Sequence, residues 1–180
     1  VGNMISDFVK GNKRFDYAEG IRKGITLHRQ IDRFTDEHIA TKAAKKIFQA
    51  HYRLYSGAFI DVVYDHFLAN DPGIFSETSL LEFSGRVYKT LARYQTILPQ
   101  RFAMMFPYMK DQNWLYNYRT AMGTEKSFGG LVRRALYMEE SKTAAELFEK
   151  NYAELREYYH QFFPELQRFA RHMFDELISS

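Results

Sequence analysis

Three short segments in the first third of the chain place metal-binding side chains four residues apart. The pairs are Asn3 with Asp7, His28 with Asp32, and Asp61 with Asp65, which is followed by His66. Residues i and i+4 lie on one face of an α-helix, so each segment can direct two polar side chains into one space. The segments are otherwise rich in apolar residues, among which carboxylates are rarely buried unless they are paired or bind a metal. The pattern predicts an interior metal site assembled by three helices.

His28 and Asp32 are the first candidate ligands. A neutral imidazole and a carboxylate can bind one metal together, or the carboxylate can orient the imidazole. The alternative is an ordinary helix-surface pair, with Arg29 and Arg33 neutralising the nearby carboxylates in a structural network. Both interpretations fit the spacing.

Asp61, Asp65 and His66 are the second set of candidates. The two carboxylates share a face of AFIDVVYDHFLA, the most apolar helix expected in the chain. They repel each other unless a cation or a shared proton relieves them. The alternative is a salt bridge to Arg29 or Lys10 from another segment. A metal between the directions of Asp65 and His66 would use both as ligands.

Asp7 and Lys10 complete the candidate set. Asp7 would serve as a further ligand or as a general base, and Lys10 as a phosphate contact, although a structural role is the simpler interpretation of each alone. The sequence shows no Gly-rich phosphate loop, no identifiable nucleophilic Ser and no basic-aromatic pattern typical of nucleic-acid binding.

Composition narrows the fold and the chemistry. The chain has 180 residues, 46% of them hydrophobic and 17% aromatic, which indicates one well-packed domain over residues 1–180. It has no Cys, so disulfides and thiolate ligands are excluded and the ligands must be His, Asp or Glu. These ligands favour harder or borderline ions such as magnesium, manganese, iron or zinc.

Charge is spread unevenly along the chain. Residues 1–60 hold eleven Lys or Arg against six Asp or Glu, a net charge of +5, whereas residues 61–180 carry −2. The basic half therefore coincides with the polar candidates, which suits an anionic substrate or an acidic partner, although a solvated helix face would look the same. No apolar run reaches the roughly 18–20 residues of a membrane span, and no signal peptide is visible. We expect a cytoplasmic protein, with native residues preceding Val1.

The periodicity predicts an all-α single-domain helical bundle. No stretch alternates long enough to require a strand. We expect Asp16 to cap the second helix, Thr35-Asp36 to begin a third, Pro107 to end a short one, glycines at 123, 129 and 130 to interrupt the chain, and Pro164 to kink or end a late helix. The expected helices span residues 1–10, 17–34, 35–55, 58–69, 79–97, 100–109, 114–118, about twenty residues from 143, and 165–178.

The same three segments resemble the acyl carrier protein phosphodiesterase family. GNMISDFVKG, GITLHRQIDRFTDEH and IDVVYDHFLAND match, in order, patterns similar to GN-x-x-x-DF-x-[KR]-G, GI-x-x-HR-x-ID-x-[FL]-TD and D-V-x-[YW]-DHFL. A looser match continues through NWL-x-x-YR around Trp114 and Arg119. Members of the family usually begin with a segment resembling NFLAHLYLS, which contains a His and would precede the first residue here.

The resemblance implies both a reaction and a fold. The family hydrolyses the phosphodiester that joins 4′-phosphopantetheine to a Ser of holo-acyl carrier protein, giving the apo form. It depends on a divalent metal, with manganese favoured and magnesium or iron as alternatives. The fold it implies is similar to that of HD-type metal-dependent phosphohydrolases, which hold their metals with His and Asp side chains from several helices.

We therefore expect a metal-dependent phosphodiester hydrolase acting on an acidic carrier protein. The expected metal ligands are His28, Asp32, Asp65 and His66. The expected catalytic residues are Asp7, Lys10, Arg29 and Asp61. The expected docking residues for the carrier are Arg22, Lys23, Arg33, Lys42, Lys45 and Lys46. Two alternatives stay open: a related hydrolase of nucleotide phosphodiesters, and a non-catalytic helical module that binds an acidic protein.

Overall fold

All regular structure in the computed structural model, which describes residues 1–135 and 137–179, is helical. The all-α prediction is therefore confirmed for these residues. A 3₁₀ turn, Ser6–Phe8, follows the first helix, and a second, Gly11–Asp16, precedes α2. The α-helices are α1 (Gly2–Ile5), α2 (Glu19–Glu37), α3 (Ile39–Tyr52), α4 (Ser56–Ala69), α5 (Glu77–Arg93), α6 (Gln100–Asp111), α7 (Trp114–Asn117), α8 (Ala121–Arg134), α9 (Lys142–Lys150) and α10 (Tyr152–Ser179).

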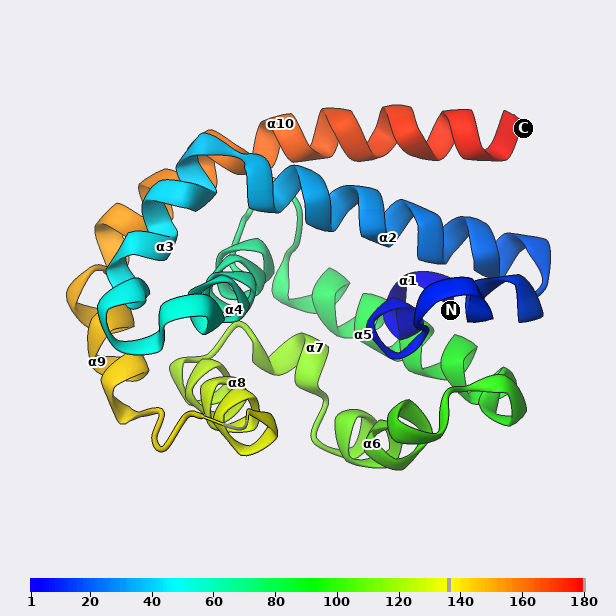
Figure 1. Cartoon of the computed structure of the whole chain (residues 1–180), viewed down its shortest axis with the longest axis horizontal. Helices are drawn as coiled ribbons and strands as arrows, with labels where there is room; N and C mark the ends of the chain where they lie inside the picture. The colour runs from blue at the N-terminus through cyan, green and yellow to red at the C-terminus, as the bar shows by residue number, and fades with distance from the viewer. Residues whose placement is uncertain (136, 180) are drawn as a thin grey trace.

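Two apolar clusters hold the helices together. One is built by α3, α4, α8, α9 and α10 around aromatic side chains such as Phe59 and Tyr159. The other joins α1, α2, α5 and α6 through residues such as Ile25 and Phe102. The long helix α2 contributes to both, because Ile25 belongs to the second cluster while Phe34 packs against the first. Figure 1 shows α2 and α10 side by side along one edge of the molecule, where they pack together.

The boundary between α2 and α3 differs from the prediction. Thr35 and Asp36 do not begin a helix but lie inside α2, where the Thr35 hydroxyl donates to the Ile31 carbonyl at 2.9 Å. His38 is the N-cap of α3 instead, since its ring Nδ1 accepts a hydrogen bond from the Ala40 N–H at 3.2 Å. The longer α2 therefore carries Asp36 on the same face as the two candidate ligands before it.

Other predicted helix ends are also wrong. Pro107 lies inside α6 and Pro164 inside α10, so neither ends its helix. Glycines that were expected to interrupt the chain lie inside α8; at Gly123 an added Cβ would lie 1.9 Å from the Asn117 carbonyl oxygen, so glycine there allows a close approach. Asp16 does not cap α2, which has no side-chain cap. In the described part of the chain no helix has the length and apolarity that a membrane span requires.

Candidate metal and acid–base site

Asp7, His28 and Asp32 form a compact cluster in which one ligand atom of each lies within 4.8 Å of the others. His28 Nε2 lies 3.2 Å from Asp7 Oδ1 and 3.2 Å from Asp32 Oδ2. The His28 side chain is 21% exposed, while both carboxylates are more open to solvent. Two of the three predicted segments therefore meet at one point.

The close packing of α1 on α2 brings Asp7 to His28. A Cβ added to Gly2 would lie 2.0 Å from the Ile21 carbonyl oxygen, and one added to Gly24 would lie 3.2 Å from the Gly2 Cα. A side chain at position 2 would therefore force the two backbones apart, and one at position 24 would fit only tightly. The 3₁₀ turn that follows α1 then places Asp7 against the face of α2 that carries His28.

The protonation states of the cluster are coupled. The hydrogen bond from His28 lowers the pKa of Asp7, although partial burial opposes this. The same bond raises the pKa of His28, again against burial. Burial raises the pKa of Asp32, and the charge of His28 partly offsets that effect. Without a metal the geometry therefore favours a protonated His28, and a metal ion must displace that proton to bind the imidazole.

A cavity of about 460 Å³ lies beside this cluster, between the Ser6–Phe8 turn, α2, α4 and α10. Its polar wall is made by Asp7, His28, Asp32, Asp36, Asp61 and Asp65. The third predicted segment thus contributes both of its carboxylates to the same space. Of the six candidate aspartates and histidines in the three segments, five line the cavity and His66 does not. Asp36, which was not among the candidates, lines the cavity with them.

The pKa values of Asp61 and Asp65 are raised to about 7. Both side chains are open to the cavity, but protein surrounds them on their other sides, and this burial is the largest cause of each shift. Repulsion from Asp65 and then Asp32 adds to the shift of Asp61. A hydrogen bond with the Tyr118 side chain partly offsets the shift of Asp65. Near neutral pH the pair can therefore hold a proton between them or release it.

The structure places His66 away from the cavity in which the other candidate ligands meet. His66 is 5% exposed and does not line the cavity. Its Nδ1 lies 2.8 Å from the Tyr118 carbonyl oxygen, and its Nε2 lies 3.1 Å from the Tyr152 hydroxyl. Consecutive helical residues point about 100° apart, so Asp65 faces the cavity while His66 faces the core. His66 is a structural residue with both ring nitrogens engaged.

Lys10 and Arg29 also lie outside the cavity lining. Lys10 is exposed at the N-cap of the Gly11–Asp16 turn. Arg29 donates a hydrogen bond to the Val9 carbonyl and so fastens the first turn to α2. The structure therefore does not bring these two side chains to the cavity: Lys10 lies on the surface, and Arg29 positions the first turn against α2.

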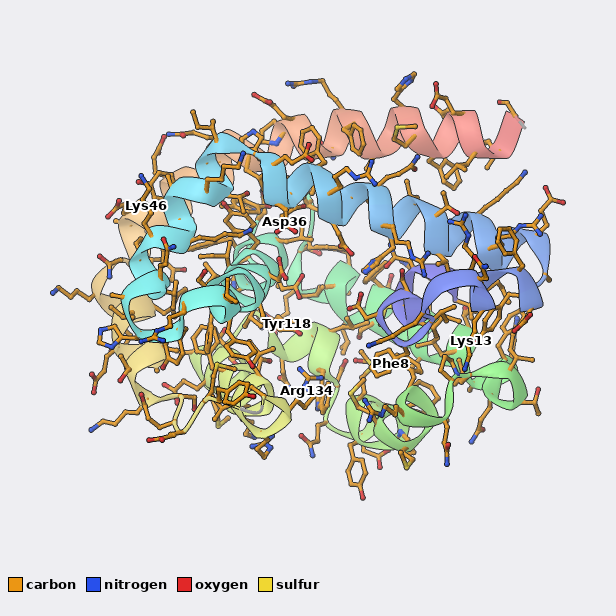
Figure 2. All side chains as sticks on the ribbon, viewed as in Figure 1. Phe8, Lys13, Asp36, Lys46, Tyr118 and Arg134 are labelled. Carbon is orange, nitrogen blue, oxygen red and sulfur yellow. The ribbon has the colours of Figure 1, made fainter. Side chains whose placement is uncertain are left out.

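Asp36 and Tyr118 are site residues that the sequence analysis missed. Asp36 lines the cavity and pairs with Lys45 at 2.6 Å. Its spacing of four residues from Asp32 was a usable signal, but the expected helix start at Asp36 concealed it. Tyr118 is the tyrosine of the NWL-x-x-YR match, but nothing in the sequence assigned it a role, and it reaches Asp65 from a segment far along the chain. Figure 2 labels Asp36 on the α2 side and Tyr118 on the α7 side of the central region.

The six predicted docking residues fall into two groups. Arg22 and Lys23 lie near the start of α2, and Lys23 pairs with Glu19 at 2.8 Å. The lysines of α3 lie beyond the other end of α2, where Lys42 and Lys46 are exposed and Lys45 is ion-paired. The length of α2 separates the groups by roughly 20 Å, at ~1.5 Å per residue. The six residues therefore do not form one face: Arg22 and Lys23 lie at one end of α2, and Arg33 and the α3 lysines lie at the other.

The donor set of the cavity fits a divalent metal. Asp7, His28 and Asp32 offer two carboxylates and one imidazole, and further carboxylates line the same wall. Such oxygen-rich sets with one nitrogen suit hard or borderline divalent ions. The cluster alone does not choose between these ions.

Comparison with known proteins agrees with this chemistry. The family model described as acyl carrier protein phosphodiesterase matches residues 1–166. The acyl carrier protein phosphodiesterase of Klebsiella pneumoniae is 29% identical over 170 residues, covering 94% of this chain and 88% of its own length. That of Yersinia pestis is 28% identical over 173 residues, covering 96% and 90%.

No solved structure matches the chain, so its expected likeness to HD-type phosphohydrolases stays a prediction. The family resemblance carried by the three motifs is confirmed, because the match extends over nearly the whole chain. The chain belongs to the acyl carrier protein phosphodiesterase family.

Proposed function

We propose that the protein hydrolyses the phosphodiester between 4′-phosphopantetheine and a serine of holo-acyl carrier protein, releasing the apo carrier. Family membership supports the reaction and the substrate. The structural observation that carries the proposal is the cavity in which the Asp7–His28–Asp32 cluster lies beside the Asp61–Asp65 pair. A cytoplasmic location belongs to the same proposal.

The chain's own residues divide the work between binding and proton transfer. Asp7, His28 and Asp32 would hold the divalent ion, with manganese our first choice. When bound, such an ion polarises a phosphoryl oxygen and acidifies water. Asp61 and Asp65, with pKa values of about 7, can accept a proton from the attacking water and return one to the serine oxygen as its bond to phosphorus breaks. Asp65 thus acts on protons in this proposal, and not as the ligand expected from the sequence.

The test is release of 4′-phosphopantetheine from holo carrier protein, followed by mass spectrometry with manganese and with a chelator. His28→Ala and Asp32→Ala should abolish release. The chain offers a matched control, because His172 and Glu176 form another i,i+4 histidine–carboxylate pair, at 3.4 Å on the exposed face of α10. His172→Ala should release the prosthetic group at the wild-type rate. Metal-independent release, or equal losses in both histidine variants, would refute the site.

In the alternative of a non-catalytic module that binds an acidic protein, arginine side chains would neutralise the cavity carboxylates. Arg29 instead binds the Val9 carbonyl, and none of the ion pairs among the described residues joins Arg29 or Arg33 to a cavity carboxylate. This arrangement favours the enzyme. The other alternative is a hydrolase of nucleotide phosphodiesters. Comparing the rates of cleavage of a nucleotide phosphodiester and of the holo carrier distinguishes it from the proposed function.

We propose that carrier docking uses Arg33, Lys42 and Lys46, which are exposed beside the cavity end of α2. Acyl carrier proteins are acidic, so complementary charge should speed their association. Charge reversal at Lys42 and Lys46 should raise KM for the holo carrier about tenfold at low salt and leave a small phosphodiester unaffected. Reversal of Lys142 and Lys150 on α9 is the control; equal effects of the two double variants would contradict a specific face.

A further inference from the structure

The cavity has a second wall that the proposed chemistry does not use. Beside the carboxylates it is lined by the apolar side chains of Leu68, Phe163 and Leu166, each only partly buried. Tyr64 and Phe162 stand behind them in the core. An enzyme that bound only a metal and a phosphate would need no apolar surface facing its cavity, so this wall calls for an apolar ligand group.

The apolar wall is held rigidly by the core. The Phe163 ring stacks on Tyr159, with centroids 5.1 Å apart, and the Tyr159 hydroxyl donates to Asp71 at 3.0 Å. Phe162 stacks on Tyr64 at 4.8 Å. The wall is therefore formed before any ligand arrives, which lowers the entropic cost of binding.

The register of α4 sets the carboxylates and the apolar wall close together. Asp61, Asp65 and Leu68 occupy positions i, i+4 and i+7, which lie on one helix face. Leu68 therefore follows Asp65 by about 4.5 Å along the helix axis, at ~1.5 Å per residue. A ligand group that contacts Leu68 must lie within a few bonds of the phosphorus held at the carboxylate end.

The substrate of the proposed function has such a group. In 4′-phosphopantetheine the ester oxygen is followed by one methylene and then by a quaternary carbon that carries two methyl groups. We propose, as an inference that rests on the proposed function, that Leu68, Phe163 and Leu166 form the subsite for this gem-dimethyl group. The subsite would select pantoyl phosphodiesters over phosphodiesters without a branched carbon.

Substrate and enzyme changes can be combined to test the contact. Carrier protein is loaded either with 4′-phosphopantetheine or with an analogue that lacks both methyl groups, and kcat/KM is measured for each. Wild type should prefer the natural group by about 10- to 100-fold, the range expected for small apolar groups in a fitted pocket. Leu166→Ala should lose most of that preference. Ile178→Ala, on the same helix but 59% exposed and outside the cavity lining, should keep it.

A second variant and a binding measurement protect the test against misfolding. Leu166→Phe should fill the subsite, so it should slow cleavage of the natural group more than cleavage of the analogue. Calorimetric titration with free 4′-phosphopantetheine and its analogue should show the same preference without turnover. Equal rates on both carriers in wild type, or a full preference in Leu166→Ala, would overturn the subsite. Wild type that cleaves a small phosphodiester but neither carrier would instead refute the proposed substrate.

Discussion

Replacing Asp61 with Asn should stabilise the metal-free protein at neutral and higher pH. In the folded chain the pKa of Asp61 is about 7, against an ordinary value of 3.8. The folded state therefore binds more protons than the unfolded state between these values, and stability falls as pH rises through this window. Above it, ionised Asp61 opposes folding, mainly because burial removes water from the carboxylate.

The magnitude follows from the size of this shift. About three pKa units at ~1.36 kcal/mol each give a ceiling of about 4 kcal/mol. The side chain is open to cavity water, so screening reduces the expected effect to about 1–2 kcal/mol. In a chain of this length that difference corresponds to about 3–6 °C in Tm.

Urea unfolding in the presence of a chelator measures the effect. The advantage of Asp61→Asn over wild type should be near zero at about pH 3, reach roughly a third of its full size at about pH 5 and grow to about 1–2 kcal/mol at about pH 8. Asp175→Asn, an exposed change on α10, should show no such growth. Manganese should reduce this advantage at high pH, because a divalent cation held by Asp7, His28 and Asp32 would attract the ionised Asp61 carboxylate in the same cavity. Parallel pH curves for wild type and Asp61→Asn would refute the idea that burial perturbs this carboxylate.

Three further changes test the placement of the site. His66→Ala should lower stability by about 2–4 kcal/mol in urea unfolding, because it empties a buried position and leaves its partners unpaired. It should keep the metal affinity measured by calorimetry. His28→Ala should instead lose metal affinity and keep most of the stability. Asp7→Asn should lower the pKa of His28, which NMR of the metal-free protein can measure. The stabilisation that protonated His28 contributes should then be lost at a lower pH than in wild type. Gly2→Ala should force α1 from α2 and weaken metal binding, whereas Gly20→Ala, whose added Cβ meets nothing within 4 Å, should stabilise the protein by about 0.5–1 kcal/mol.

The cluster of Asp7, His28 and Asp32 was predictable because its geometry is mostly local. The spacing of His28 and Asp32 fixes both on one face once α2 forms, and the apolar period shows that it forms. Asp7 could be proposed from its own segment, although its contact with His28 depends on how α1 packs. Because apolar periodicity is also a local signal, it predicted most of the long helices, and the errors were at helix ends.

The choice between Asp65 and His66 could not be made from the sequence. Nearly every residue of α4 other than its acids is apolar, so the pattern does not say which side faces a cavity and which the core. Packing of α7 and α8 settles it, because Tyr118 offers its carbonyl to His66 from a distant part of the chain. Phe162 of α10 is buried in the core, but that Leu166 one turn later faces a cavity depends on tertiary packing.

The charge of the cavity implies an order of binding. Five aspartates line it, and the cations near them offset only part of their charge: Lys45 pairs with Asp36, and Arg134 lowers the pKa of Asp7. A phosphodiester is itself an anion, so the metal-free cavity should repel it once the aspartates ionise. Arg29 makes no direct contact that would relieve this repulsion, because its guanidinium donates to the Val9 carbonyl outside the cavity lining. The cation must therefore bind first, and the substrate should show no measurable affinity for the metal-free protein above neutral pH.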